Sequence, residues 1–330
     1  MTAPERRLQR IARFELEDGT VLRDVVQAWH LEGELNAARD NAVVVFHSLT
    51  GQAETVGGWL GALIGPGGVI DTRRYAAICA NLLGSCYGTT GPAEVSPFPT
   101  VTPRDQARLF QHLLDELGVH SVVLAAGGSL GGMVAMEWAV ENPSLARAVA
   151  VFAAPAAHTA YAIAWNHIQR AAVEAAGERG LEIARMVGMM TYRTAAEQAQ
   201  RFGRGLEADG RWSVASYLDH QGRKLRERFS ADSYVALTKA MDAHDVGRGR
   251  GGVEAALRRF RGRWIGVGIP GDLLYSPEDV RAWTDVAGAE YREIISPRGH
   301  DAFLLETEQI GAILAEALAI GEAAADGGPR

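Results

Sequence analysis

The sequence predicts an α/β fold in which helices cover both faces of a mostly parallel central sheet. Short runs rich in Val, Ala and Ile alternate with helical stretches, as is typical of parallel strands that are buried on both faces. This alternation stops after Pro155 and returns only near residue 264. The interruption predicts an all-helical insert within the part of the chain that forms the sheet.

The strand pattern begins with an antiparallel hairpin. Arg13–Leu16 and Val25–Trp29 flank Glu17–Thr20, an acidic turn that contains glycine. Continuous apolar runs then predict four buried strands, near Ala42–His47, Tyr75–Leu83, Val122–Ala126 and Ala148–Phe152.

Two helices are expected between these strands. The first covers Pro103–Leu117, with proline in its first turn and Gly118 at its end. The second contains the apolar run Met133–Val140 and stops at Asn142-Pro143. Both would pack against the sheet.

Residues 156–260 show helical periodicity and many arginines but no strand pattern. Strands are expected again at Trp264–Ile269 and Tyr291–Ile295, before a final helix over Phe303–Leu318 and a frayed tail from Gly321. The sequence therefore predicts a core formed by residues 1–155 and 261–330, with residues 156–260 as a helical lid. A separate helical domain is the alternative, and the return of the sheet favours the insert.

A G-x-S-x-G pattern joins the third buried strand to its helix. Ser129 lies in Gly127-Gly-Ser-Leu-Gly131, directly after Val122–Ala126. A sharp strand-to-helix turn needs small neighbours and exposes the serine hydroxyl at the carboxyl edge of the sheet. The flanking strand and helix favour a nucleophilic serine over a glycine-rich turn without chemistry.

A base and an acid follow this serine in the chain. His300 lies on a loop after the strand near Tyr291–Ile295, and Asp272 lies just past Trp264–Ile269. The order Ser129, Asp272, His300 is that of the α/β-hydrolase triad, in which imidazole takes the serine proton and the carboxylate orients the imidazole. His47 is the main rival base, but it precedes the serine and is better explained as part of the cleft rim.

Composition excludes several other classes of function. The 330 residues are 47% hydrophobic and carry a net charge of −7, which argues against nucleic acid as a partner. We expect no secretory signal, no membrane-spanning run and no metal site, and Cys79 and Cys86 are expected to be reduced thiols. A cytoplasmic protein follows from these expectations.

With these residues identified, the chain resembles the homoserine O-acetyltransferase family of methionine biosynthesis, an acyltransferase branch of the α/β-hydrolase superfamily. The resemblance extends over nearly the whole chain. It rests on the motifs Ser48-Leu-Thr-Gly51, Asn81–Pro92, Gly127–Met133 with Glu137-Trp138, Thr191-Tyr-Arg193, Arg201-Phe-Gly-Arg204, Tyr217–Gly222, His244–Arg250 and Gly299–Phe303.

The resemblance implies specific roles and substrates. Ser129 would carry the acyl group, with Asp272 and His300 completing the triad. Arg201 and Asp301 would bind the carboxylate and the ammonium of the amino-acid acceptor. The oxyanion-hole donors would be the backbone N–H groups of Leu49 and Leu130.

The implied substrates are acetyl-CoA, as a co-substrate, and L-homoserine. The resemblance implies no cofactor, and it implies a homodimer formed through the lid helices.

Alternatives remain open at this point. Arg201 is otherwise a solvated helix charge, and Asp301 is otherwise a helix cap. The chain has Leu130 where the family commonly has Met, Ser48 where Ala is common, and Gly271 where Ser is usual. Homoserine O-succinyltransferase, serine O-acyltransferase, esterase and thioesterase activities are therefore rivals, as is a catalytically dead binding module.

Overall fold

The computed structural model describes residues 6–54 and 58–326 of the chain. Its centre is an eight-stranded sheet with the strand order β1-β2-β6-β3-β7-β8-β9-β10. The strands are β1 (Arg7–Glu15), β2 (Val21–Glu32), β3 (Ala42–Phe46), β6 (Ala76–Ala80), β7 (Val122–Gly128), β8 (Ala146–Phe152), β9 (Arg263–Gly268) and β10 (Glu290–Glu293).

The sheet is mostly parallel, which confirms the predicted fold class. From β6 to β10 all neighbouring strands run parallel, and every residue of β3, β6 and β7 is buried. The antiparallel hairpin of β1 and β2 adds to one edge through β2 and β6. It is longer than predicted, because most of β1 is exposed and the apolar alternation that would reveal it is weak.

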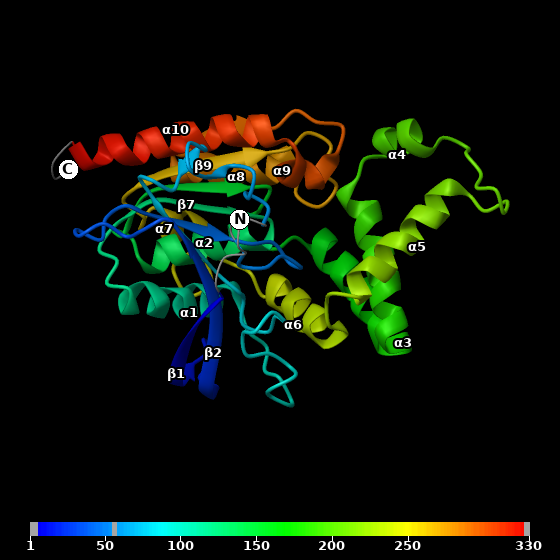
Figure 1. Cartoon of the computed structure of the whole chain (residues 1–330), viewed down its shortest axis with the longest axis horizontal. Helices are drawn as coiled ribbons and strands as arrows, with labels where there is room; N and C mark the ends of the chain where they lie inside the picture. The colour runs from blue at the N-terminus through cyan, green and yellow to red at the C-terminus, as the bar shows by residue number, and fades with distance from the viewer. Residues whose placement is uncertain (1–5, 55–57, 327–330) are drawn as a thin grey trace.

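Helices cover both faces of the sheet (Figure 1). The core on one face includes side chains of α1 (Pro103–Glu116), α2 (Leu130–Glu141), α7 (Val253–Leu257) and α8 (Pro277–Ala287). The core on the other face includes α10 (Thr307–Asp326) and the segment around the short strands β4 (Ile64–Gly65) and β5 (Ile70–Asp71).

The helices begin where capping chemistry places them. The Thr102 side chain accepts a hydrogen bond from the Asp105 backbone N–H, and the Thr102 backbone N–H donates one to the Asp105 carboxylate. Helix α1 therefore starts in a capping box, with proline in its first turn. Ser276 and Asp279 cap α8 in the same way. Helix α8 is not among the elements predicted from the sequence, although Ser276-Pro277 marks its start.

The insert forms α3 (Ala160–Tyr192), α4 (Ala195–Phe202), α5 (Ser213–Arg226) and α6 (Ala231–Asp242). The first three project to one side of the sheet (Figure 1). α3 is kinked at Gly177, whose φ is +52°. In contrast, α7 packs into the core beside α2 and α8, so the range 156–260 contains both projecting helices and a core element.

The loop after α6 is held to the core by buried ion pairs. Glu137, on α2, is fully buried and pairs with Arg104 of α1 and Arg250 of the loop. Arg104 and Arg248 both pair with Glu17 in the turn of the β1–β2 hairpin. The motif His244–Arg250 therefore joins the base of the insert to α2 and to the β1–β2 hairpin.

The end of the chain differs from the prediction of one helix over Phe303–Leu318. A 3₁₀ turn (Gly299–Asp301) leads into α9 (Ala302–Leu305), which stops at Glu306 in a non-helical conformation before α10 begins. The predicted fraying from Gly321 is wrong as far as Asp326, because α10 continues to that residue. Gly321 packs so closely on Val123 that a Cβ atom would lie 2.3 Å from its carbonyl oxygen, and residues 327–330 lie outside the described part.

Across the described ranges, no helix is both long and apolar enough to cross a membrane.

Candidate active site

Ser129 lies on a strained turn between β7 and α2. Its backbone has φ +55° and ψ −124°, a conformation that is unusual for a residue with a side chain. A Cβ atom at Gly131 would lie 2.1 Å from the Phe46 carbonyl oxygen, and one at Gly127 would lie 2.2 Å from the Gly131 oxygen. The small residues of the motif are therefore required by the turn itself.

The structure brings His300 and Asp272 to this serine. His300 Nε2 lies 3.0 Å from Ser129 Oγ, and His300 Nδ1 lies 2.6 Å from Asp272 Oδ2. The second carboxylate oxygen of Asp272 accepts hydrogen bonds from the backbone N–H groups of Leu274 (2.8 Å) and Tyr275 (3.1 Å). The carboxylate is thus fixed on both oxygens, and it favours a proton on Nδ1 of His300 and a free Nε2 facing the serine.

The surroundings of His300 set its basicity. Burial lowers its pKa, but the charge and hydrogen bond of Asp272, with a further contribution from Asp301, raise the pKa above its ordinary value of 6.5. The rings of Tyr275 and Phe303 each lie 5.3 Å from the imidazole in edge-on contact. His300 is therefore a stronger base than a free imidazole and is held in an aromatic cage.

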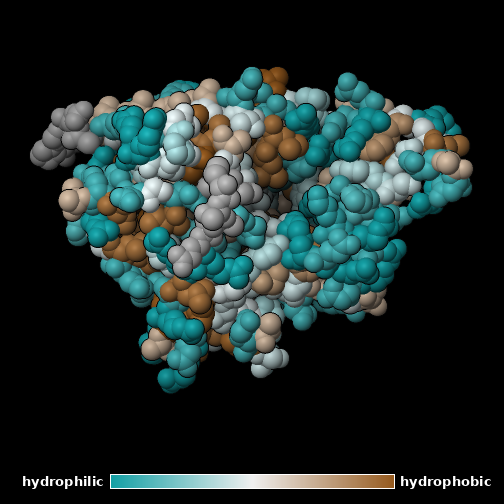
Figure 2. Space-filling model, viewed as in Figure 1, coloured by the Kyte–Doolittle hydropathy of each residue, from teal (hydrophilic) through white to brown (hydrophobic). Residues whose placement is uncertain are grey.

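A cavity of about 400 Å³ opens beside Ser129 and His300. The viewed surface is hollowed between the core and the insert (Figure 2), and both parts line the cavity. The core contributes the Ser48–Gln52 loop, Trp59, Tyr275 and Phe303, and the insert contributes polar residues of α3 such as Asn166, Arg185 and Thr191. Ser129 and His300 thus face a pocket that is partly covered by residues of the insert.

Two backbone N–H groups are candidates for binding an oxyanion. Leu130 is the first residue of α2, so its N–H has no acceptor within the helix. Leu49 lines the cavity together with Ser129. The carbonyl of Ser48, which shares a peptide plane with the Leu49 N–H, accepts hydrogen bonds from Gly51 N (2.8 Å) and His47 Nδ1 (2.9 Å).

His47 is not the base of Ser129. It is buried, its ring bonds to the Ser48 carbonyl, and burial lowers its pKa to about 4. Its imidazole is therefore neutral at pH 7 and supports the loop, as the sequence analysis preferred.

Asp301 lies at the cavity wall next to His300. Its Oδ2 accepts a hydrogen bond from Arg193 Nε at 2.8 Å. Burial raises the pKa of Asp301, although the nearby Arg193, Arg185 and His300 act to lower it. The side chain makes no helix-capping hydrogen bond, so the alternative role as a cap is not realised.

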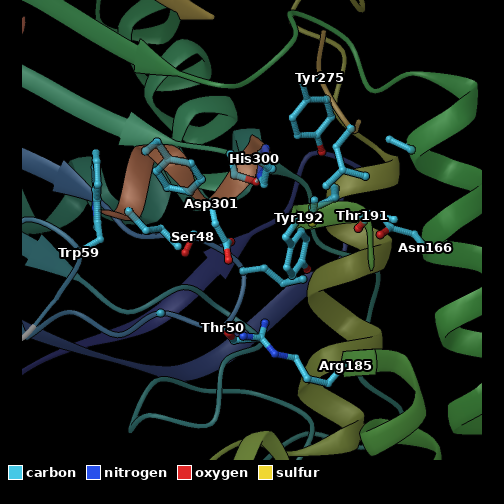
Figure 3. Close-up of a pocket in the computed structure, with 18 of the residues that line it drawn as sticks. Ser48, Thr50, Trp59, Asn166, Arg185, Thr191, Tyr192, Tyr275, His300 and Asp301 are labelled. Atoms are coloured by element: carbon cyan, nitrogen blue, oxygen red, sulfur yellow. Dashed lines mark hydrogen bonds between the residues drawn. The ribbon is translucent and has the colours of Figure 1, made fainter. Parts of the chain in front are cut away.

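The structure does not place Arg201 at the cavity. This residue is exposed near the end of α4, and its guanidinium stacks over Tyr217 (4.4 Å) and Phe202 (5.0 Å). Arg185 of α3 lines the cavity instead and points into it together with Asp301 (Figure 3). Its guanidinium lies 5.6 Å from the Tyr192 ring, and it makes no hydrogen bond or ion pair with another described residue.

Arg185 was not predicted from the sequence, because Arg201 belongs to a recognisable motif and Arg185 does not. Arg185 and Tyr192 are separated by seven residues, two helical turns, so they share a face of α3. In the part of the chain that the structure covers, no group of three or more His, Cys, Asp or Glu side chains is arranged to hold a metal ion.

The chain is similar in sequence to several known proteins. A sequence profile of the alpha/beta hydrolase fold matches residues 41–237. A homoserine O-acetyltransferase of Moorella thermoacetica is 43% identical, with 91% of this chain and 92% of that protein aligned. One from Thermus thermophilus is also 43% identical, covering 91% and 88%.

Solved structures show the same architecture. The homoserine O-acetyltransferase of Staphylococcus aureus superposes with a TM-score of 0.84 at 31% identity, covering 95% of each chain. The L374D mutant of esterase E22 is 21% identical and superposes with a TM-score of 0.86, covering 95% of this chain and 99% of that chain, which reflects the shared fold.

Proposed function

Because the chain belongs to the homoserine O-acetyltransferase family, which has the α/β-hydrolase fold, we propose that it transfers an acetyl group from acetyl-CoA to L-homoserine. The observation that carries this proposal is the hydrogen-bonded series Ser129–His300–Asp272 at the wall of a cavity that the side chains of Arg185 and Asp301 also line.

In the first half-reaction, Ser129 Oγ attacks the thioester carbonyl carbon while His300 Nε2 takes the hydroxyl proton. The carbonyl oxygen becomes an oxyanion, which the N–H groups of Leu49 and Leu130 stabilise; one such donor contributes roughly 10²–10³ to kcat. The carbon–sulfur bond then breaks, His300 returns the proton to the sulfur, and CoA leaves. Ser129 now carries the acetyl group.

The second half-reaction reverses these roles with another nucleophile. His300 Nε2 takes the proton of the homoserine hydroxyl, and that oxygen attacks the acetyl carbon. The ester bond to Ser129 breaks, His300 returns the proton to Oγ, and O-acetylhomoserine leaves. Asp272 stabilises the imidazolium form of His300 in both steps.

Arg185 and Asp301 are suited to recognise the acceptor. A guanidinium presents a planar set of donors that matches a carboxylate, and a carboxylate matches an ammonium group. Arg185 has no partner of its own among the described residues, whereas Asp301 is already oriented by Arg193. We therefore assign the acceptor carboxylate to Arg185 in place of Arg201, and the acceptor ammonium to Asp301.

Helices α3–α6 act in this proposal as a lid that restricts access of water to acetyl-Ser129. The lid also supplies the interface of a homodimer. Two pairs of exposed apolar side chains lie seven residues apart on α3, Tyr161 with Ile168 and Ile183 with Met190, and each is 37–55% exposed. Helical spacing of seven places each pair on one face, where a second copy could cover it.

The proposed reaction would be the first committed step of methionine biosynthesis, in the cytoplasm, and it needs no cofactor beyond its two substrates. Succinyl-CoA as donor and serine as acceptor are the alternatives, followed by plain esterase or thioesterase activity.

Release of free CoA, measured with acetyl-CoA and succinyl-CoA each crossed with homoserine and serine, separates these activities. We expect rapid release only with acetyl-CoA plus homoserine. Faster CoA release with succinyl-CoA or with serine would show that this compound is the preferred substrate. CoA release that is independent of any acceptor would make the protein a thioesterase.

A further inference from the structure

A second series of aspartate, histidine and hydroxyl groups lies beside the proposed catalytic one. His158 Nε2 is 2.9 Å from the Tyr275 hydroxyl, and His158 Nδ1 is 3.3 Å from Asp242 Oδ1. His158 and Tyr275 both line the cavity and are both buried. The acetyl transfer described above uses neither of them.

The direction of the hydrogen bond between His158 and Tyr275 follows from the charge of Asp242, which lies 3.3 Å from His158 Nδ1 without hydrogen-bond geometry. Asp242 accepts hydrogen bonds from Asn166 (2.8 Å) and Arg170 (2.5 Å). Burial raises the pKa of Asp242, but these bonds together with His158 outweigh burial and lower it. An ionised Asp242 favours the proton on Nδ1 of His158, so Nε2 accepts and the Tyr275 hydroxyl donates.

His158 and Asp242 mark the two ends of the helical segment α3–α6. His158 comes just before α3, and Asp242 is the last residue of α6. The two connections are bonded to each other, since His158 N donates to the His244 carbonyl and Val246 N donates to the Ala156 carbonyl, both at 2.9 Å. The second series therefore lies where the insert leaves and rejoins the core.

Tyr275 connects this point to the catalytic groups. Its backbone N–H donates to Asp272 Oδ1 at 3.1 Å, and its fully buried ring meets the His300 imidazole at 5.3 Å with an interplanar angle of 70°. The backbone fixes one end of the side chain and the bond to His158 fixes the hydroxyl end. The Tyr275 ring is thereby held in a fixed position in contact with the His300 imidazole (Figure 3).

We propose that His158 and Tyr275 are positioning residues that hold the His300 imidazole against Ser129 and link its placement to the base of the helical insert. The inference rests on the proposed function only in taking His300 as the base of Ser129. It assigns neither residue a contact with the reacting atoms.

The test measures acetylation of Ser129 by p-nitrophenyl acetate, from the initial burst of p-nitrophenolate, with Ser129→Ala as the blank. Tyr275→Phe removes the hydroxyl but keeps the ring, and His158→Leu removes its acceptor. Each variant should slow acylation about tenfold, with KM unchanged within about twofold. This loss is smaller than the roughly 100-fold that a 1 Å misplacement of a reacting group can cost. The double variant should be no slower than the slower single variant, since both remove one bond.

Two further variants and a proton NMR spectrum distinguish a positioning role of His158 and Tyr275 from a general contribution to stability of the fold. His158→Gln should recover part of the rate, because its amide oxygen can accept from Tyr275. Tyr75→Phe is the matched control. Tyr75 is a buried tyrosine whose hydroxyl donates to Glu322. It directly precedes β6, at the end of this strand away from the catalytic residues. The low-field proton resonance of His300 Nδ1–H should shift or broaden in Tyr275→Phe and His158→Leu and stay unchanged in Tyr75→Phe.

Wild-type acylation and an unchanged resonance in Tyr275→Phe would overturn the inference, and this variant decides the test if His158→Leu fails to fold. Losses that multiply in the double variant, or a raised KM at unchanged kcat, would also overturn it; the latter would make Tyr275 a substrate contact. A wild-type protein acetylated by p-nitrophenyl acetate but not by acetyl-CoA would contradict the proposed function and leave this test valid.

Discussion

His300 must be neutral to accept the proton of Ser129, so its pKa sets the acidic limit of the reaction. Asp272 and Asp301 raise this pKa above 6.5 against the effect of burial. We therefore expect kcat/KM for acetyl-CoA to rise with pH through a midpoint above 6.5, measured by CoA release at several pH values.

Asp272→Asn should lower both the rate and this midpoint. The substitution removes the charge that favours imidazolium, while burial, which lowers the pKa, remains. A loss of roughly 10⁴ in kcat is the scale known for such a substitution in a serine triad. An unchanged midpoint in Asp272→Asn would show that another group controls the base.

Arg185 and Arg201 form a matched pair of variants for acceptor binding. Arg185→Ala should raise the homoserine KM by about 10-fold or more, the scale of a lost charge-assisted hydrogen bond of roughly 1.5–3 kcal/mol. Arg201→Ala should leave KM within about twofold, because its guanidinium stacks on Tyr217 outside the cavity. Steady-state kinetics at saturating acetyl-CoA measures both, and the reverse result would restore the assignment to Arg201.

At the scale of elements, the strand-to-helix turn at Ser129 depends on close backbone packing. Gly131→Ala would place a Cβ atom 2.1 Å from the Phe46 carbonyl oxygen, between β3 and α2. We expect destabilisation by more than about 3 kcal/mol, or failure to fold, measured by denaturant unfolding.

Gly311→Ala on α10 provides the control for this loss. There the new methyl would meet the flexible end of Leu63 at 3.2 Å and the side chain of Val69 at an ordinary contact distance of 3.5 Å, so the change should stay within about 1 kcal/mol. A Gly131→Ala protein as stable as this control would mean that the turn can relax.

The sequence predicted elements best where local patterns and tertiary environment agree. The strands β3, β6 and β7 are wholly buried, so their apolar runs are continuous and easily identified. The break at Glu306 was not predictable, because the apolar periodicity of α9 and α10 continues across it. The tail from Gly321 looked frayed because its packing on Val123 joins residues far apart in the chain.

The same distinction applies to the site. Ser129, Asp272 and His300 follow strand ends, so topology alone brings them to one edge of the sheet. Arg185 reaches the cavity only through the way α3 crosses the loops of the core, which the sequence pattern does not reveal. Its spacing of two helical turns from Tyr192 was the available clue.

For the whole molecule, the exposed apolar face of α3 predicts self-association. Ile168→Glu combined with Met190→Glu should convert a dimer into a monomer, measured by light scattering after size-exclusion chromatography, because burying unpaired carboxylates is costly. Acetylation of Ser129 should persist in that monomer, since Ser129, His300 and Asp272 all come from the same chain. A wild-type monomer, or an unchanged dimer in the double variant, would contradict the proposed interface.

The central claim is that one chain carries the acetyl group on Ser129 and protects it from water until the acceptor arrives. Intact-mass spectrometry after incubation with acetyl-CoA alone tests it most directly. We predict one added acetyl group, mapped to Ser129 and absent in Ser129→Ala, that is lost slowly alone and quickly on addition of homoserine. Hydrolysis of acetyl-CoA at the same rate with and without homoserine, or acetyl transfer that proceeds in Ser129→Ala, would contradict the account.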